Sequence, residues 1–251
     1  MSEHVRTALL LVLRRPGVLS LLVFVPLYSV VFFTVVRQNG RPDLAATVAL
    51  TSFVMTLWSH AVFVSSEAVD HDRAEGMLEV LLAAPRSYAR SLILRIAATE
   101  AVCLPAAAEI ALIGGWGFGF PLRMAAPAAF VAALLLTFAG TVGSAILLAS
   151  LFVLIRGART YQNALTYPCY LLAGLVVPAS LLPRPLAAVS HGWFLAWGAD
   201  LMRDALHAVP AELPRRLLVL AVLAAGQNLA GVLFMRRVIR RARDGGVALH
   251  A

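Results

Sequence analysis

Long stretches without a charged residue divide this sequence and constrain its fold more than any other feature. They are residues 16–36, 44–66, 124–155, 160–183 and 217–235, which hold 21, 23, 32, 24 and 19 residues. A helix needs roughly 20 residues to cross the hydrocarbon core of a bilayer, so each stretch is long enough to span it. The stretches are apolar on every helical face, which excludes a soluble bundle. They also lack the two-residue alternation of membrane β-strands.

A sixth candidate span covers residues 93–116, where Arg95, Glu100 and Glu109 are the charged residues. An ionisable side chain inside a span is energetically costly, and it therefore indicates function or a paired contact. Glu100 is a candidate for the translocation path or for an inter-helix contact, and both alternatives stay open. Glu109 is expected near the outer surface, where water would solvate it.

These segments together predict an all-α integral membrane protein with a single domain, residues 1–251. Its six transmembrane helices are expected at about 16–36, 44–66, 93–116, 126–155, 161–183 and 216–235. The fourth span contains small residues that favour close contact between helices. They are Ala139, Gly140, Gly143 and Ser144.

The arginines predict the orientation, because the sequence contains no lysine. With six spans both termini share one side, and that side carries 14 arginines against 7 on the other. Positively charged loops tend to stay in the cytoplasm, so we predict cytoplasmic N- and C-termini. Residues 1–15 carry several leucines together with Arg6, Arg14 and Arg15, which favours an amphipathic N-terminal interfacial helix, with a disordered tail as the alternative. The chain has no folded basic domain of the kind that binds nucleic acid.

The largest predicted external segment, residues 184–216, separates the fifth and sixth spans. Its charge-free core of 15 residues is too short to cross the bilayer, so we predict re-entrant or interfacial helices here. Asp200, Arg203 and Asp204 have the spacing of local ion pairs on a helix. His60, in the second span, is expected to be packed and hydrogen-bonded.

Residues 67–95 form the longest predicted cytoplasmic connection. On a helical wheel Asp72, Glu75 and Glu79 fall on one stripe, and apolar residues cover the opposite face. Helices that lie on anionic membranes usually carry Lys or Arg on the polar face, so an acidic face favours contact with another protein. The alternative is a solvated charge run on a structured loop.

This connection resembles a known family. The run RAEGMLEVLLAAP, at Arg73–Pro85, is similar to the cytoplasmic-loop motif of type-2 ATP-binding-cassette (ABC) permeases, which export drugs and polysaccharides. Met77 stands where that motif usually has Thr. A second stretch resembles the family pattern between spans five and six, although the usual Pro-Leu-Thr is missing around Phe194–Trp197. Its matching residues are Gly174, Pro178, Leu182, Pro183, Asp200 and Arg203.

The resemblance implies a transporter permease, which is not itself an enzyme, in the plasma (inner) membrane. A coupling helix would dock into a cytoplasmic ABC ATPase subunit through Asp72, Arg73, Glu75, Gly76, Leu78, Glu79, Leu82 and Pro85. A second permease chain, identical or different, would complete the transporter. No cofactor or metal is expected on this chain, since ATP and Mg²⁺ would bind the partner. The external re-entrant region would include Pro178, Pro183, Asp200 and Arg203.

The residues themselves add one constraint on the source of energy. A phosphate-binding P-loop requires a lysine, and this chain has none, so an ATP-driven transporter would need a separate motor subunit. Two alternatives remain. A proton- or ion-coupled secondary transporter would favour inverted repeats and several charges at mid-membrane. An intramembrane enzyme would need clustered acids or histidines, for which Asp70, His71 and Asp72 are the candidate group.

Overall fold

A computed structural model describes residues 27, 29–65, 72, 75–76, 88–120, 124–154, 158–176 and 181–243. Within these ranges every regular element is a helix, which agrees with the predicted all-α class. The elements are Ser29–Gln38, the 3-10 helix η1 (Pro42–Leu44), α3 (Ala45–His60), the π-helix η2 (Ala61–Ser65), α6 (Tyr88–Ala101), α7 (Pro105–Leu112), the π-helix η3 (Ile113–Gly117), α8 (Pro127–Leu154), α9 (Ala158–Leu172), α10 (Arg184–His191), α11 (Phe194–His207) and α12 (Leu213–Arg243).

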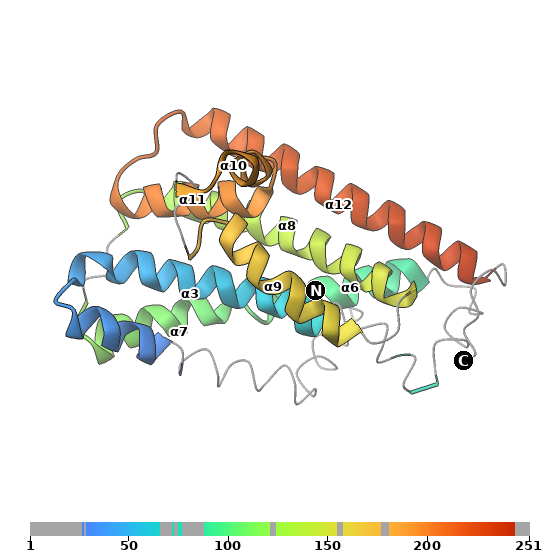
Figure 1. Cartoon of the computed structure of the whole chain (residues 1–251), viewed down its shortest axis with the longest axis horizontal. Coiled ribbons are helices and arrows are strands. Elements are labelled where there is room, and N and C mark those ends of the chain that lie inside the picture. The colour runs from blue at the N-terminus through green and yellow to red at the C-terminus, as the bar shows by residue number, and fades with distance from the viewer. Residues whose placement is uncertain are drawn as a thin grey trace.

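Four helical runs in the described part of the chain are long and apolar enough to cross a membrane. They are Pro42–Val64, Tyr88–Gly117, Pro127–Phe152 and Leu213–Arg241, with 23, 30, 26 and 29 residues. All four lie along the long axis of the molecule (Figure 1). They overlap the second, third, fourth and sixth predicted spans.

The other two predicted spans are shorter in the described structure. The apolar helix Ser29–Gln38 covers only the second half of the first predicted span, and most of residues 16–28 lie outside the described residues. α9 has 15 residues and ends at Leu172, well before residue 183, where the fifth span was expected to end. Gly174 causes this early end: its φ of +67° is in the left-handed region, where a helix cannot continue. Six spans and the side of each terminus stay predictions, and residues 1–15 lie outside the described residues.

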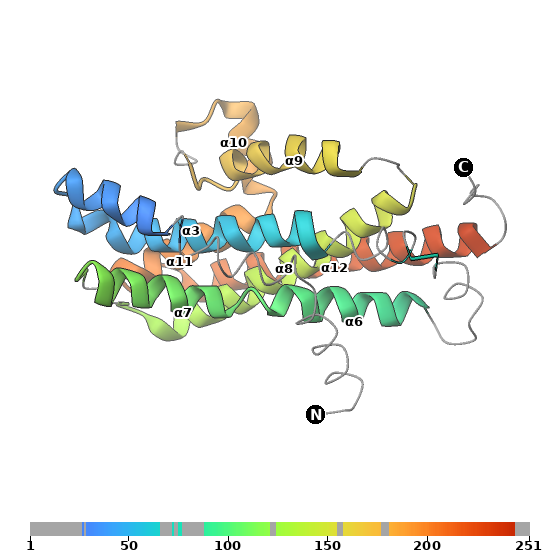
Figure 2. The ribbon, with the colours of Figure 1, turned by 90° about the horizontal axis from the view of Figure 1, so that it is seen from below.

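The third run is interrupted near its middle. α6 ends at Ala101, three residues form a turn, and α7 begins at Pro105, because proline has no N–H to continue the hydrogen-bond ladder. The two helices still follow one another end to end beside α3 (Figure 2). Glu100 is fully buried before the turn, whereas Glu109 is half-buried after it.

α8 is the central helix of the fold, and it packs along α12 and against α11. Glycines make the contact with α12 close: a Cβ on Gly143 would lie 2.7 Å from the backbone nitrogen of Asn228, and one on Gly231 would lie 2.6 Å from the carbonyl oxygen of Gly143. The Asn228 side chain donates to the Ala139 carbonyl at 2.7 Å. The predicted role of the small residues in the fourth span is therefore confirmed at Gly143, and also at Gly140, where a Cβ would collide with Phe194 of α11.

Two helices too short to cross a bilayer, α10 and α11, lie between α9 and α12, as predicted for this region. α11 has eight buried residues and packs on both α8 and α3. Gly198 allows this approach, because a Cβ there would collide with Thr137 of α8. α11 lies toward the end of the molecule that holds η1, whereas α6 and the last turns of α12 lie at the other end (Figure 1). We refer to the end that holds η1 as the Pro42 end and to the end that holds α6 as the Tyr88 end.

Candidate functional site

The predicted ATPase-coupling segment lies only partly within the described residues. Arg73, Leu78, Glu79, Leu82 and Pro85 fall outside them. Glu75 and Gly76 form an exposed turn, and Gly76 has φ +67°. A regular helix cannot run through a residue in this region of φ, so the predicted helix is interrupted at Gly76.

The buried position of the Asp72 side chain contradicts a second part of the helical-wheel interpretation. Asp72 was expected on an exposed acidic stripe, but its side chain is only 5% exposed and faces α6. The Tyr88 hydroxyl donates to Asp72 Oδ2 at 2.7 Å, and Arg95 Nη1 donates to Oδ1 at 2.9 Å. Tyr88 and Arg95 are seven residues apart, which places them on one face of α6. We call these three residues the Asp72 anchor.

The Asp72 anchor attaches the Glu75–Gly76 turn to the start of the third run. Arg95 is the partner that makes burial of the carboxylate tolerable, since an unpaired buried charge is strongly unfavourable. The helical wheel of residues 72–85 could not reveal that Asp72 is buried, because the wheel contains no information about its partners at positions 88 and 95.

A buried contact between a histidine and a carboxyl group joins α3 and α6 at mid-bundle. Nδ1 of His60 lies 3.2 Å from Oε2 of Glu100, and the two side chains are 2% and 0% exposed. The prediction that His60 is packed and hydrogen-bonded is confirmed. Glu100 makes the inter-helix contact that was one of its two alternatives. A role for Glu100 in the translocation path stays a prediction.

α9 is attached to the same part of α3 by polar side chains. Nε2 of Gln162 donates to the carbonyl of Val62 at 3.0 Å, inside the π-helix η2. The Tyr170 hydroxyl contacts the Ser59 hydroxyl and donates to the Met55 carbonyl at 3.2 Å. A π-helix interrupts the regular ladder and often marks a functional position. The polar centre of the bundle therefore comprises residues from α3, η2, α6 and α9.

At the Pro42 end, the candidate residues form two ion pairs. Arg203 Nη1 donates to Asp200 Oδ1 at 2.6 Å, which confirms this predicted pair on α11. Asp204 instead accepts from Arg216 of α12 at 2.6 Å. Burial raises the pKa of the Asp200 carboxyl, and the neighbouring Arg203 opposes that rise. Pro183 precedes the first turn of α10 as its N-cap, and Pro178 lies outside the described residues.

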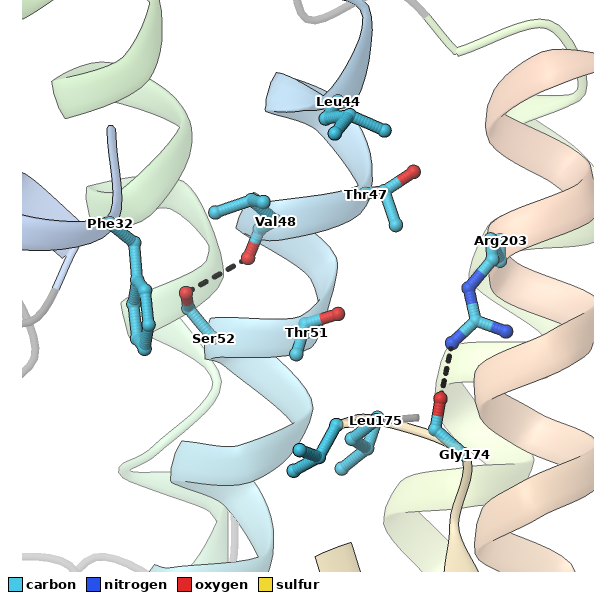
Figure 3. A pocket seen from close by; sticks show the side chains of 10 residues that line it. Phe32, Leu44, Thr47, Val48, Thr51, Ser52, Gly174, Leu175 and Arg203 are labelled. Carbon is cyan, nitrogen blue, oxygen red and sulfur yellow. Dashed lines mark hydrogen bonds between the residues drawn. The ribbon is translucent and has the colours of Figure 1, made fainter. Parts of the chain in front are cut away.

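Arg203 also links α11 to the end of α9. Its Nη2 donates to the carbonyl of Gly174 at 3.0 Å, across 29 residues of sequence. This bond joins two of the residues that match the family pattern between spans five and six, Gly174 at the end of α9 and Arg203 on α11. Arg203 lines a cavity of about 510 Å³ between α3, α11 and the Gly174–Val176 segment (Figure 3). The threonines that line it, Thr47 and Thr51, were missed in the sequence, although their four-residue spacing puts them on one helix face.

Long apolar helices with buried polar contacts between them define the class of this protein as a polytopic helical membrane protein. Comparison with protein families then gives the family. The model of the ABC-2 type transporter family matches residues 5–207, which is most of the chain, so the chain belongs to the ABC-2 type transporter family. It is thus a membrane component of an ABC transporter, and not itself an enzyme. Comparison with curated proteins finds no match.

Proposed function

We propose that this chain is the permease subunit of an ABC exporter in the plasma membrane, driven by a separate ATPase subunit. The substrate would be a drug, a lipid or a polysaccharide. A second permease chain, identical or different, completes the pathway. ATP and Mg²⁺ bind the ATPase partner, because a chain without lysine has no P-loop of its own.

The observation that carries this proposal is the exposed Glu75–Gly76 turn next to the Asp72 anchor. Glu75 is exposed, while the Asp72 side chain is bonded to α6. Closure of the ATPase subunits would move the turn and, through Arg95, the start of the third run. The family membership supports the same arrangement.

Co-purification of the tagged chain with a P-loop ATPase from its native host tests the proposal directly. Glu75→Arg with Glu79→Arg reverses two charges of the coupling segment, so the tagged permease should lose its ATPase and export should stop. Glu212→Arg is the matched control, since Glu212 is an exposed acid at the Pro42 end. It should retain the ATPase. If the double variant retains the ATPase and exports normally, the coupling assignment fails.

The buried His60–Glu100 pair favours a second candidate function, a proton-coupled secondary transporter. Paired ionisable groups inside a membrane are found in proton relays. The two functions respond oppositely to energy supply. An ABC exporter should stop when ATP is depleted and continue when the proton gradient is collapsed. Transport with the reverse dependence would favour the second candidate.

A further inference from the structure

The cavity at the Pro42 end has a polar side and an apolar side. Thr47, Thr51 and Arg203 supply the side-chain polar groups on one side, and in Figure 3 the two threonine hydroxyls point toward the side of Arg203. Phe32 and Val48 lie on the opposite side of α3 in that view, together with Ser52, whose hydroxyl is already used in a bond to the Val48 carbonyl. Such a division matches an amphipathic molecule, with a polar head and an apolar tail.

Arg203 is held in place with donors to spare. It donates to Gly174 and Asp200 in the described structure, which uses two of the five N–H groups of a guanidinium. Asp200 is not among the residues that line the cavity. The guanidinium is therefore the charged group that lines the cavity. Its partner Asp200, which does not line the cavity, holds it in position. A cation would be repelled here, and a wholly apolar ligand would leave the remaining N–H groups of the guanidinium without water or an acceptor.

The hydroxyls complete a set of donors suited to phosphate oxygens. Thr47 and Thr51 lie one helical turn apart on α3, opposite Arg203 on α11. Thr47 is fixed by a 3.3 Å contact between its Oγ1 and Nε2 of His207. An arginine with hydroxyl groups is a common way to bind a phosphate, since the guanidinium adds charge and a fixed donor geometry.

The size and rim of the cavity favour a lipid over a free anion. A volume of about 510 Å³ is larger than a phosphate needs and lies in the usual range for small-molecule sites. Apolar residues at its edge are exposed: Phe32 is 40%, Leu44 39% and Val176 62% exposed. Acyl chains could leave the cavity over these side chains into the bilayer. A free phosphate would leave this apolar surface unused.

We propose that the cavity lined by Thr47, Thr51 and Arg203 binds the phosphate headgroup of an acidic amphiphile, whose chains leave across Phe32, Leu44 and Val176. The bound headgroup bridges α3 and α11. This site is distinct from the coupling segment, and it does not depend on the proposed ATPase partner.

Binding to the full chain in detergent micelles tests the site. The probe is fluorescent phosphatidic acid, followed by anisotropy, and the comparison ligand is diacylglycerol with the same acyl chains and fluorophore. Phosphatidic acid should bind saturably, and diacylglycerol at least about tenfold more weakly, because a charge-assisted contact contributes roughly 1.5–3 kcal/mol. Arg203→Gln should remove that difference, and Arg203→Lys should restore part of it. Arg215→Gln, at an exposed arginine on the same end, should bind like the wild type.

A second variant keeps the test decisive even if Arg203→Gln misfolds. Thr51→Trp fills the cavity and leaves the bond between Arg203 and Gly174 intact, so it should weaken phosphatidic acid binding while the protein stays monodisperse. Equal affinity for phosphatidic acid and diacylglycerol would overturn the proposal, as would wild-type binding by both Arg203→Gln and Thr51→Trp. Inorganic phosphate and unlabelled phosphatidic acid are compared as competitors of the probe. If both displace it at the same concentration, the site is a simple anion site, which also overturns the proposal. These measurements need neither ATP nor transport, so failure of the ABC assignment cannot be mistaken for failure of the lipid site.

Discussion

At the scale of single residues, two acidic side chains buried within the bundle contact side chains of other elements. Asp72 is held by Tyr88 and Arg95, and Glu100 faces His60. In water such pairs contribute little, but a buried charge that loses its partner is strongly destabilising. Asp72, which was expected on an exposed stripe, and Glu100, for which an inter-helix contact was one alternative, thus both make contacts between elements.

Removing Arg95 should destabilise the protein. Arg95→Met leaves the Asp72 carboxylate with the Tyr88 hydroxyl as its partner among the described residues. We expect a loss of about 1–3 kcal/mol, below the fully buried case because Arg95 is 22% exposed. Thermal unfolding in detergent, followed by size-exclusion chromatography, measures this as a lower Tm. Arg215→Met breaks the exposed pair with Glu212 and should change stability by less than about 0.5 kcal/mol. Equal Tm values for the two variants would contradict a structural Asp72 anchor.

Changes at Glu100 separate a packing role from proton transfer. Glu100→Gln keeps a hydrogen-bonding side chain near His60 and removes the charge, so under the ABC proposal export should persist. Glu100→Leu loses the contact altogether, and we expect the free energy of unfolding to fall by about 1–3 kcal/mol. Export and Tm are measured on both variants. Loss of export in Glu100→Gln with an unchanged Tm would instead indicate a proton-carrying carboxyl.

At the scale of elements, close packing of α8 on α12 depends on glycines. Helices in a bilayer gain little from the hydrophobic effect, because lipid is as apolar as their side chains, so small residues that permit dense contact become important. Gly143 and Gly231 face each other across this contact, and Asn228 and Gln227 add hydrogen bonds to α8. α8 thereby holds α11 and α12 together.

Alanine substitutions test this contact with an internal control. Gly143→Ala and Gly231→Ala each bring a Cβ within 2.7 Å of backbone atoms, which cannot rotate away, so α8 and α12 must separate. We expect a loss of about 1–3 kcal/mol for each. Gly226→Ala lies on the same helix α12 with nothing within 4 Å of the new Cβ, and it should be neutral or slightly stabilising. Similar Tm values for all three variants would contradict the packing argument.

At the scale of the whole molecule, the sequence predicted what depends on local composition and missed what depends on distant pairing. The second, third, fourth and sixth spans follow from apolar length, and the Asp200–Arg203 pair follows from three-residue spacing on a helix. α9 ends early inside an apolar run, because the left-handed Gly174 stops it, and hydropathy is insensitive to that backbone conformation. The Asp72 anchor and the Arg203–Gly174 bond join residues 16 to 29 positions apart, where no short pattern can identify the partner.

Orientation is the property on which the functional proposal depends most, because the Glu75 turn must face the ATPase. Asn39 lies at the Pro42 end and is exposed, whereas Glu75 is exposed at the Tyr88 end. In a background with Cys103→Ala and Cys169→Ala, a membrane-impermeant thiol reagent added to intact cells should label Asn39→Cys and leave Glu75→Cys unlabelled. Permeabilised cells provide the control, since both positions should then react. The opposite pattern in intact cells would put the turn outside and exclude ATPase coupling through it, while the helices and their packing would be unchanged.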